Sequence, residues 1–116
     1  MNIEEIRDFC LSKKGVTESF PFDKTTLVFK VGNKMFLLMN IDRETKIAVK
    51  CEPELAIELR EKYNFIEGAY HMNKKHWNSI ILNLADNTFI KKQINNSYNL
   101  VLNSLPKRII NEIINI

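Results

Sequence analysis

Residues 25–41 read TTLVFKVGNKMFLLMNI and carry the strongest structural signal in this chain of 116 residues. Apolar and polar side chains alternate in residues 25–31 as in a half-buried β-strand, and residues 34–41 resume as a second strand. The centre, Gly32-Asn33, supplies two residues that tolerate a positive φ, as a tight type I′ turn requires. The stretch therefore predicts a β-hairpin. Residues 46–51 follow a short polar turn and predict a third strand of the same antiparallel sheet.

Three helices are predicted around these strands. The first covers residues 2–13, where Asn2 is a suitable N-cap. The second begins at Pro53, because proline suits the first position of a helix. The third begins at an N-cap formed by Asp86 or Asn87 and ends near residue 104. The sequence thus predicts an antiparallel sheet accompanied by helices.

A second hairpin-like wing is predicted between the second and third helices. Its strand-like halves are residues 65–72 and 76–82. The polar turn Asn73-Lys74-Lys75, which we call the basic turn, divides them. Two adjacent lysines at the tip of such a turn are expected to be exposed to solvent.

The C-terminal residues form a short amphipathic segment. Residues 1–108 are predicted to be a single domain, and residues 109–116 a tail. Five isoleucines lie on one side of this tail, namely Ile109, Ile110, Ile113, Ile114 and Ile116. So short a helix must dock on something to persist. We expect it to fold back onto its own chain, giving a monomer, because a dimer through one such tail would bury less area than stable dimers do.

Composition places the chain among ordinary globular domains. Hydrophobic residues make up 45% of it and charged residues 27%. The longest apolar run, residues 35–39, is far shorter than the roughly 20 residues of a membrane span. The acidic N-terminus lacks a signal-peptide pattern, so a cytoplasmic location is expected. Cys10 and Cys51 have no metal-ligand spacing and are predicted to be reduced core residues.

The positive charge is concentrated in one third of the chain. The net charge is +3, yet residues 71–108 hold six basic residues and one acidic residue. Counterion release from phosphates supplies most of the sequence-independent affinity of proteins for nucleic acid, so this excess favours DNA as a partner. The alternative is a solvated, lysine-rich surface.

The densest chemistry lies in residues 70–78, which read YHMNKKHWN. Lysines bind phosphates, asparagine amides read base edges, and aromatic rings stack on bases. The candidate nucleic-acid-binding residues are His71, Asn73, Lys74, Lys75, His76, Trp77, Asn78, Lys91, Lys92, Lys107 and Arg108. Trp77 has a second interpretation, because the single tryptophan of a small domain is usually a core residue.

Motifs for catalysis are absent from the sequence. It contains no Gly-rich phosphate loop, no nucleophile motif and no histidine-rich metal spacing. The sequence therefore predicts a protein that is not an enzyme and needs no cofactor. Glu4, Glu5 and Asp8 on the first helix offer a possible cation site, although such a trio is more often a solvated face.

Six short stretches, taken in order, point to a known family. They are Phe20-Pro21-Phe22, Val31-Gly32-Asn33-Lys34-Met35-Phe36, Cys51-Glu52-Pro53-Glu54, the run from Tyr70 to Trp77, Ser97-Tyr98 and Leu105-Pro106-Lys107. With these stretches the chain resembles the bacterial MmcQ/YjbR family. The resemblance implies an α+β fold similar to the CyaY/frataxin architecture, with helices packed on one face of an antiparallel sheet. It also implies a DNA-binding protein with a double-wing arrangement.

Two positions depart from the family pattern. Gly32-Asn33 stands where the family tends to have Gly-Gly, and a type I′ turn accepts this pair. Gly68-Ala69 stands where the family tends to have Pro-Gly, which leaves the approach to the basic turn less rigid.

One functional hypothesis leads and two rivals remain. In the leading hypothesis, a small DNA-binding module neutralises phosphates with the basic turn, while Asn73 or Asn78 approaches a base edge. In the first rival, an exposed sheet face binds another protein; this face carries Thr26, Lys30, Lys46 and Lys50. In the second rival, the acidic trio of the first helix carries a metal ion, as in frataxin-like proteins.

Overall fold

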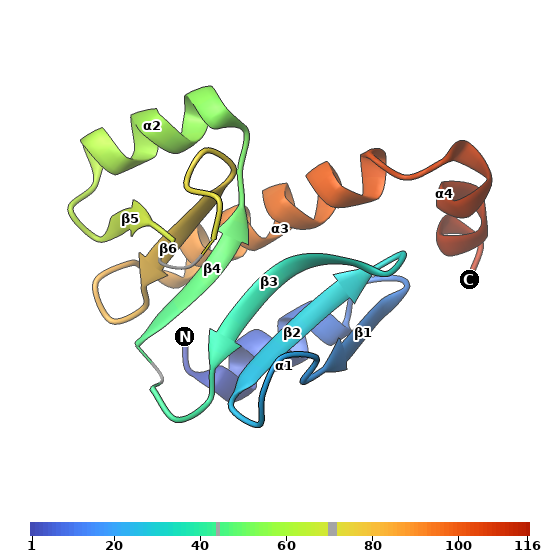
Figure 1. Cartoon of the computed structure of the whole chain (residues 1–116), viewed down its shortest axis with the longest axis horizontal. Helices are drawn as coiled ribbons and strands as arrows, with labels where there is room; N and C mark the ends of the chain where they lie inside the picture. Colours follow the sequence, from blue (N-terminus) through green and yellow to red (C-terminus); the bar gives the residue numbers. More distant parts are fainter. Residues whose placement is uncertain (44, 70–71) are drawn as a thin grey trace.

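The computed structural model describes residues 1–43, 45–69 and 72–116. Within them the chain forms one six-stranded sheet and four helices (Figure 1). In chain order the elements are α1 (Ile3–Leu11), β1 (Val16–Ser19), β2 (Thr26–Val31), β3 (Lys34–Asn40), β4 (Lys46–Lys50), α2 (Pro53–Lys62), β5 (Ile66–Gly68), β6 (Trp77–Ile81), α3 (Asn87–Asn103) and α4 (Lys107–Ile114). The α+β class is therefore confirmed.

The sheet is antiparallel throughout. Its strands lie in the order β1-β2-β3-β4-β6-β5, and each neighbouring pair runs in opposite directions. β2 and β3 form the predicted hairpin. Gly32 has a φ of 56° and Asn33 a φ of 65°, so both turn residues are left-handed, as a type I′ turn requires.

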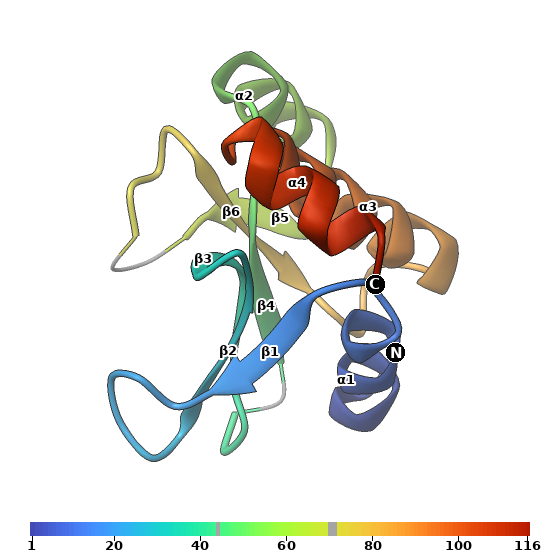
Figure 2. The same cartoon turned by 90° about the vertical axis from the view of Figure 1, so that its right-hand side faces the viewer.

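The helices cover one face of the sheet, as the family resemblance implies (Figure 2). The main core lies between them and includes Ile6, Leu27, Phe29, Val31, Leu37, Ile47, Val49, Ile80, Ile90, Ile94 and Val101. α3 is tied to the middle of the sheet by Ser97. Its hydroxyl donates to the Phe36 carbonyl at 2.5 Å and accepts from the Lys50 N–H at 2.9 Å. These bonds fix α3 against β3 and β4.

The edge strand β1 is an element that the sequence pattern does not predict. Of its four residues only Val16 is apolar, which is too weak a signal for a strand. Tertiary contacts hold it in place. The Arg7 guanidinium of α1 donates two hydrogen bonds to the Glu18 carboxylate, at 2.6 and 2.7 Å. This pairing also lowers the pKa of Glu18.

The predicted wing forms with shorter strands than expected. β5 and β6 pair antiparallel, with Ile66 opposite Ile80 and Gly68 opposite Asn78. The loop that joins them carries the basic turn. Tyr70 and His71 lie outside the described residues.

The C-terminal helix folds back onto the domain, which is the arrangement that the sequence analysis favours. Ile113 of α4 is buried and packs against Gly15, where a Cβ would lie 2.9 Å from the Ile113 Cγ2 atom. The Lys14 Nζ atom donates to the Ile114 carbonyl at 2.7 Å. Because α4 begins at Lys107, the helix crosses the predicted boundary at residue 108.

Both cysteines are free and buried, as predicted. Burial raises the pKa of the Cys10 thiol to about 12, which keeps it protonated at neutral pH. In the described part of the chain, no helix combines the length and apolar character that crossing a bilayer demands.

Candidate functional site

The sheet face opposite the helices, which we call the outer face, is apolar at its centre. Val28, Leu38, Ala69 and Trp77 form a second buried cluster there, separate from the main core. Met35, Ala48 and Met72 pack against this cluster and are half-buried. No helix covers it in Figure 2. The outer face therefore combines a packed apolar floor with access from solvent.

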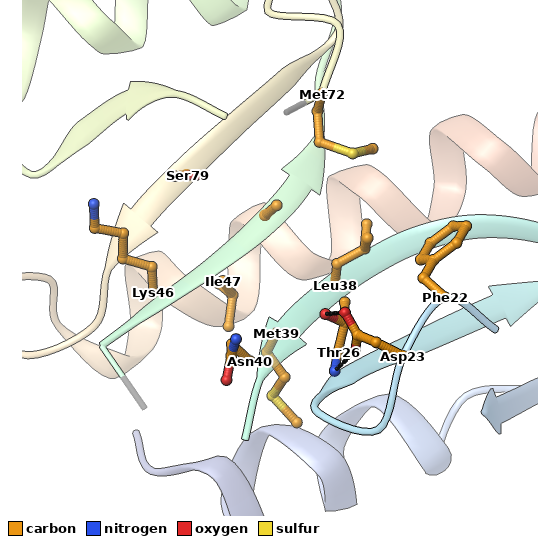
Figure 3. A pocket seen from close by; sticks show the side chains of 11 residues that line it. Phe22, Asp23, Thr26, Leu38, Met39, Asn40, Lys46, Ile47, Met72 and Ser79 are labelled. Atoms are coloured by element: carbon orange, nitrogen blue, oxygen red, sulfur yellow. Dashed lines mark hydrogen bonds between the residues drawn. The ribbon is translucent and has the colours of Figure 1, made fainter. Parts of the chain in front are cut away.

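Two loops project from the sheet on this side (Figure 2). One, residues 20–25, joins β1 to β2, and we call it the Phe22 loop. The other lies between β5 and β6, and its described residues 72–76 include the basic turn. Between the loops lies a pocket of about 480 Å³ (Figure 3), lined by Phe22, Asp23, Thr26, Leu38, Met39, Asn40, Lys46, Ile47, Ala48, Met72 and Ser79.

The Phe22 loop is shaped by the carboxylate of Asp23. Its Oδ1 atom accepts from the N–H groups of Thr25 and Thr26, at 2.9 and 2.6 Å. These backbone hydrogen bonds lower the pKa of Asp23. The turn leaves the neighbouring Phe22 side chain 64% exposed at the edge of the pocket. An exposed aromatic ring on a hydrogen-bonded turn is a ready contact for a ligand.

The basic turn is built by Asn73 and presents two lysines. The Asn73 Oδ1 atom accepts from the Lys75 N–H at 3.0 Å, so this amide shapes the turn. The Lys74 carbonyl accepts from the Arg60 guanidinium of α2 at 2.6 Å. Lys74 and Lys75 are exposed, as predicted for a turn tip. The turn thus holds two cations beside the pocket wall that Met72 forms.

Trp77 and Asn78 lie in the interior rather than on the surface. Trp77 is 7% exposed and belongs to the outer-face cluster, which agrees with the packing interpretation of this residue. Asn78 is 2% exposed and faces α2. Its Nδ2 atom donates to the Ala56 carbonyl at 3.2 Å, and its Oδ1 atom accepts from Arg60 at 3.0 Å. Asn78 therefore joins β6 to α2 and is not positioned to meet a base edge.

Of the two candidate histidines, His76 precedes β6 and borders the sheet. His76 is half-buried, and its carbonyl accepts from the Cys51 N–H at 2.7 Å. It lines a separate cleft near the start of α2, with Lys50 and Leu100. The candidate residue His71 lies outside the described residues.

The four remaining basic candidates belong to the helical layer. Lys91 and Lys92 are exposed on α3, and the Lys91 Nζ atom lies 5.6 Å from the centre of the Phe9 ring of α1. Lys107 and Arg108 begin α4, beyond the far end of α3. The part of α3 that follows Lys92 spans about 16 Å at the helical rise per residue. The basic turn lies beside α2, to which Arg60 ties it, whereas Lys91 lies beside α1 and α4 lies apart from this loop in Figure 1.

The residues of the sheet and the rest of the chain differ in net charge. Residues 20–50 and 66–81, which include β2 to β6 and both projecting loops, contain eight lysines and arginines and four acidic residues. The rest of the chain contains nine basic and ten acidic residues. The positive excess therefore belongs to the sheet and its loops. Strand alternation places three of these lysines, Lys30, Lys46 and Lys50, on the outer face with Val28 and Ala48.

The acidic trio of α1 is partly used in helix capping. The Glu5 carboxylate accepts from the Asn2 N–H at 3.1 Å, and the Asn2 side chain accepts from the Glu5 N–H at 2.8 Å. This capping box stabilises the start of α1. Across residues 1–43, 45–69 and 72–116, no three His, Cys, Asp or Glu side chains are grouped as a metal ion would need.

The site residues that sequence reasoning missed are Phe22 and Met72. The sequence predicts the polar residues of this sheet face, but it does not predict the apolar floor or the two flanking loops. For Phe22, the sequence does contain a signal. Asp23, with Thr25 and Thr26 two and three positions later, indicates an Asx turn, which would hold the preceding Phe22 ring in a loop.

Comparisons with known proteins agree with this fold. The YjbR family model matches residues 11–100. The uncharacterized protein YjbR of Escherichia coli K12 is 29% identical over 110 residues, which cover 92% of each chain. The uncharacterized protein YbdF of E. coli O157:H7 is 36% identical over 91 residues, which cover 77% of this chain and 75% of YbdF.

Two solved structures are also similar. The crystal structure of protein DR2400 from Deinococcus radiodurans superposes with a TM-score of 0.90 at 32% identity, covering 96% of this chain and 86% of that one. A crystal structure of a protein from Pseudomonas syringae gives a TM-score of 0.74 at 30% identity, covering 87% and 99%. With the family model spanning most of its length and the fold shared with these relatives, this chain belongs to the YjbR family.

Proposed function

We propose that the protein is a small DNA-binding module without catalytic activity, and that the outer face with its two loops is the binding surface. The observation that carries this proposal is the location of the positive charge. The sheet and its loops hold the whole basic excess, while the helical layer is nearly balanced. Lys74 and Lys75 extend it to the tip of a projecting loop.

Phosphate binding is the chemistry that this surface supports best. Lys74 and Lys75 are exposed and Lys30 and Lys50 are half-buried, whereas Lys46 is already paired with Glu67. Four lysines on one side of a small domain allow about four phosphate contacts. Such contacts give a slope of log K against log salt of about −0.9 per contact for a duplex and about −0.7 for a single strand.

The test is a salt titration of DNA affinity with two matched double variants. Lys74→Glu with Lys75→Glu reverses two charges on the basic turn, and Lys91→Glu with Lys92→Glu makes the same change on α3. The first pair should flatten the salt slope by about 1.5 or more, because two phosphate contacts are lost. The second pair should change it much less. Both variants should keep the thermal midpoint, since exposed charges contribute little to stability.

Two results would contradict the proposal. One is a slope that does not change in the basic-turn variant. The other is an equal change in both variants, which would mean that only the overall charge attracts DNA. Poly-glutamate serves as the acidic control ligand, and competition by it as strong as that of DNA would favour a protein partner on this face.

A further inference from the structure

We infer that the outer-face pocket receives an unpaired base, so that the DNA bound by this protein is single-stranded. The inference rests on the proposed function and names the form of nucleic acid that the same surface accepts. The outer face combines three features between its two loops: an apolar pocket, an exposed aromatic ring and two lysines.

The pocket suits a flat, apolar group of limited size. Its volume of about 480 Å³ falls in the range of small-molecule sites. Leu38 and Ala48 form its floor, and Met72 adds a flexible thioether, which contacts aromatic rings favourably. Phe22 stands at its edge, as Figure 3 shows. A base that enters this pocket can therefore stack on Phe22 and lie against Met72.

The phosphate sites and the pocket share one loop. Met72 lines the pocket, and the basic turn follows it directly in the chain. A strand whose phosphates lie on Lys74 and Lys75 therefore passes beside the pocket wall. An electrostatic track next to a stacking ring is the arrangement that single-strand-binding proteins use.

One polar group in the pocket is available to contact the base edge. The Asn40 Oδ1 atom accepts from the N–H groups of Asp42 and Arg43, at 2.9 and 3.2 Å. Its Nδ2 atom has no hydrogen-bond partner among the described residues. The orientation leaves an amide donor in the pocket for a carbonyl or ring nitrogen of a base.

A duplex cannot use these features. In a paired and stacked helix the faces of the bases are covered, and only phosphates, sugars and groove edges reach a protein. Filling the pocket from a duplex would require extruding a base, which costs a few kcal/mol. A single strand offers its bases without that cost.

The test compares three oligonucleotides of equal length: single-stranded oligo(dT), the same strand with abasic sites, and a duplex. Affinities are measured by fluorescence anisotropy for the unchanged protein, for Phe22→Ala and for Ile57→Ala. Ile57 is a matched control, because it is 50% exposed and lies on α2 in the helical layer. Both residues are exposed enough that their replacement should leave the fold intact.

We expect oligo(dT) to bind roughly tenfold more tightly than the abasic strand, since stacking of one base on an aromatic ring is worth about that much. Phe22→Ala should weaken oligo(dT) binding by a similar factor and leave the abasic strand unaffected. The salt slope should stay the same, because no phosphate contact changes. Ile57→Ala should bind all three probes like the unchanged protein.

The outcomes separate this inference from the proposed function. If oligo(dT), abasic strand and duplex bind equally and Phe22→Ala has no effect, the base pocket is wrong while DNA binding stands. If no DNA binds with a salt-dependent affinity, the proposed function fails and the inference with it. An acidic peptide with leucine side chains that binds in the pocket more tightly than oligo(dT) would overturn both in favour of a protein partner.

Discussion

Trp77 combines a packing role with a position beside the candidate site. Its ring is 7% exposed and packs with Val28, Leu38 and Ala69 under the outer face. We predict that Trp77→Ala lowers the free energy of unfolding by about 3 kcal/mol or more, as truncation of a large core side chain does. Urea denaturation measures this loss. Trp77→Phe, which keeps an aromatic ring, should lose clearly less.

A different result would change the role of this residue. If Trp77→Ala keeps its stability and loses DNA affinity, the ring is a binding surface and not part of the apolar floor.

Asp23 links the shape of the Phe22 loop to pH. Hydrogen bonds from the N–H groups of Thr25 and Thr26 hold its pKa below the usual value. The folded protein therefore binds this proton more weakly than the unfolded chain does. The resulting stabilisation is present above the unfolded pKa of about 3.9 and is lost as the pH falls through the lower folded pKa.

We predict that Asp23→Ala makes the unfolding midpoint in urea less sensitive to acidification below about pH 5. The unchanged protein should lose more stability over this range than the variant does. Asp42→Ala is the control, because it removes an exposed turn carboxylate of the same charge. Identical pH profiles for the protein and Asp23→Ala would show that the loop hydrogen bonds do not form in solution.

Among the elements, those with strong local signals could be predicted from the sequence. The β2–β3 hairpin follows from Gly32-Asn33, and α1 and α3 begin at the N-caps Asn2 and Asp86. These features depend on neighbours in the chain, so they are visible without a structure. The roles of Ser97 and Tyr98 are not, because their hydroxyls bond to Phe36, Lys50 and Lys14, far away in the sequence.

The candidate site could be predicted only in part, for the same reason. Exposure of Lys74 and Lys75 follows from a local turn. The burial of Asn78 depends on where α2 packs, and the pocket exists only when two loops separated by some fifty residues flank one sheet face. A linear charge count also groups Lys91 with Lys74, although the fold assigns them to different layers.

The C-terminal helix α4 stabilises the domain by covering apolar surface. Ile113 is buried against Gly15, and Ile109 and Ile110 pack on the main core. We predict that deletion of residues 109–116 lowers the melting temperature markedly, since each buried isoleucine contributes about 1.5–3 kcal/mol. Ile116→Ser is the control and should be neutral, because Ile116 is 77% exposed.

Light scattering on the same samples tests the fold-back arrangement. We expect a monomer before and after the deletion. A dimer that becomes an equally stable monomer would mean that the tail pairs with a second chain.

At the scale of the whole molecule, the fold separates two tasks. The helical layer, nearly balanced in charge, packs the main core against one face of the sheet. The sheet and its loops carry the basic excess, and the projecting loops and the pocket lie on the opposite face. A surface with these properties attracts polyanions over a distance of about one Debye length and then offers contacts at close range.

Backbone amide chemical shifts, measured by NMR during titration with oligo(dT), test the binding surface most directly. We predict that the perturbed amides cluster in the Phe22 loop, the basic turn and the facing strands β3 and β4. Amides of α3 around Lys91 and of α4 around Lys107 should stay in place. Perturbations centred on α3 and α4, with the Phe22 loop and the basic turn unchanged, would contradict the assignment of the outer face as the DNA-binding surface.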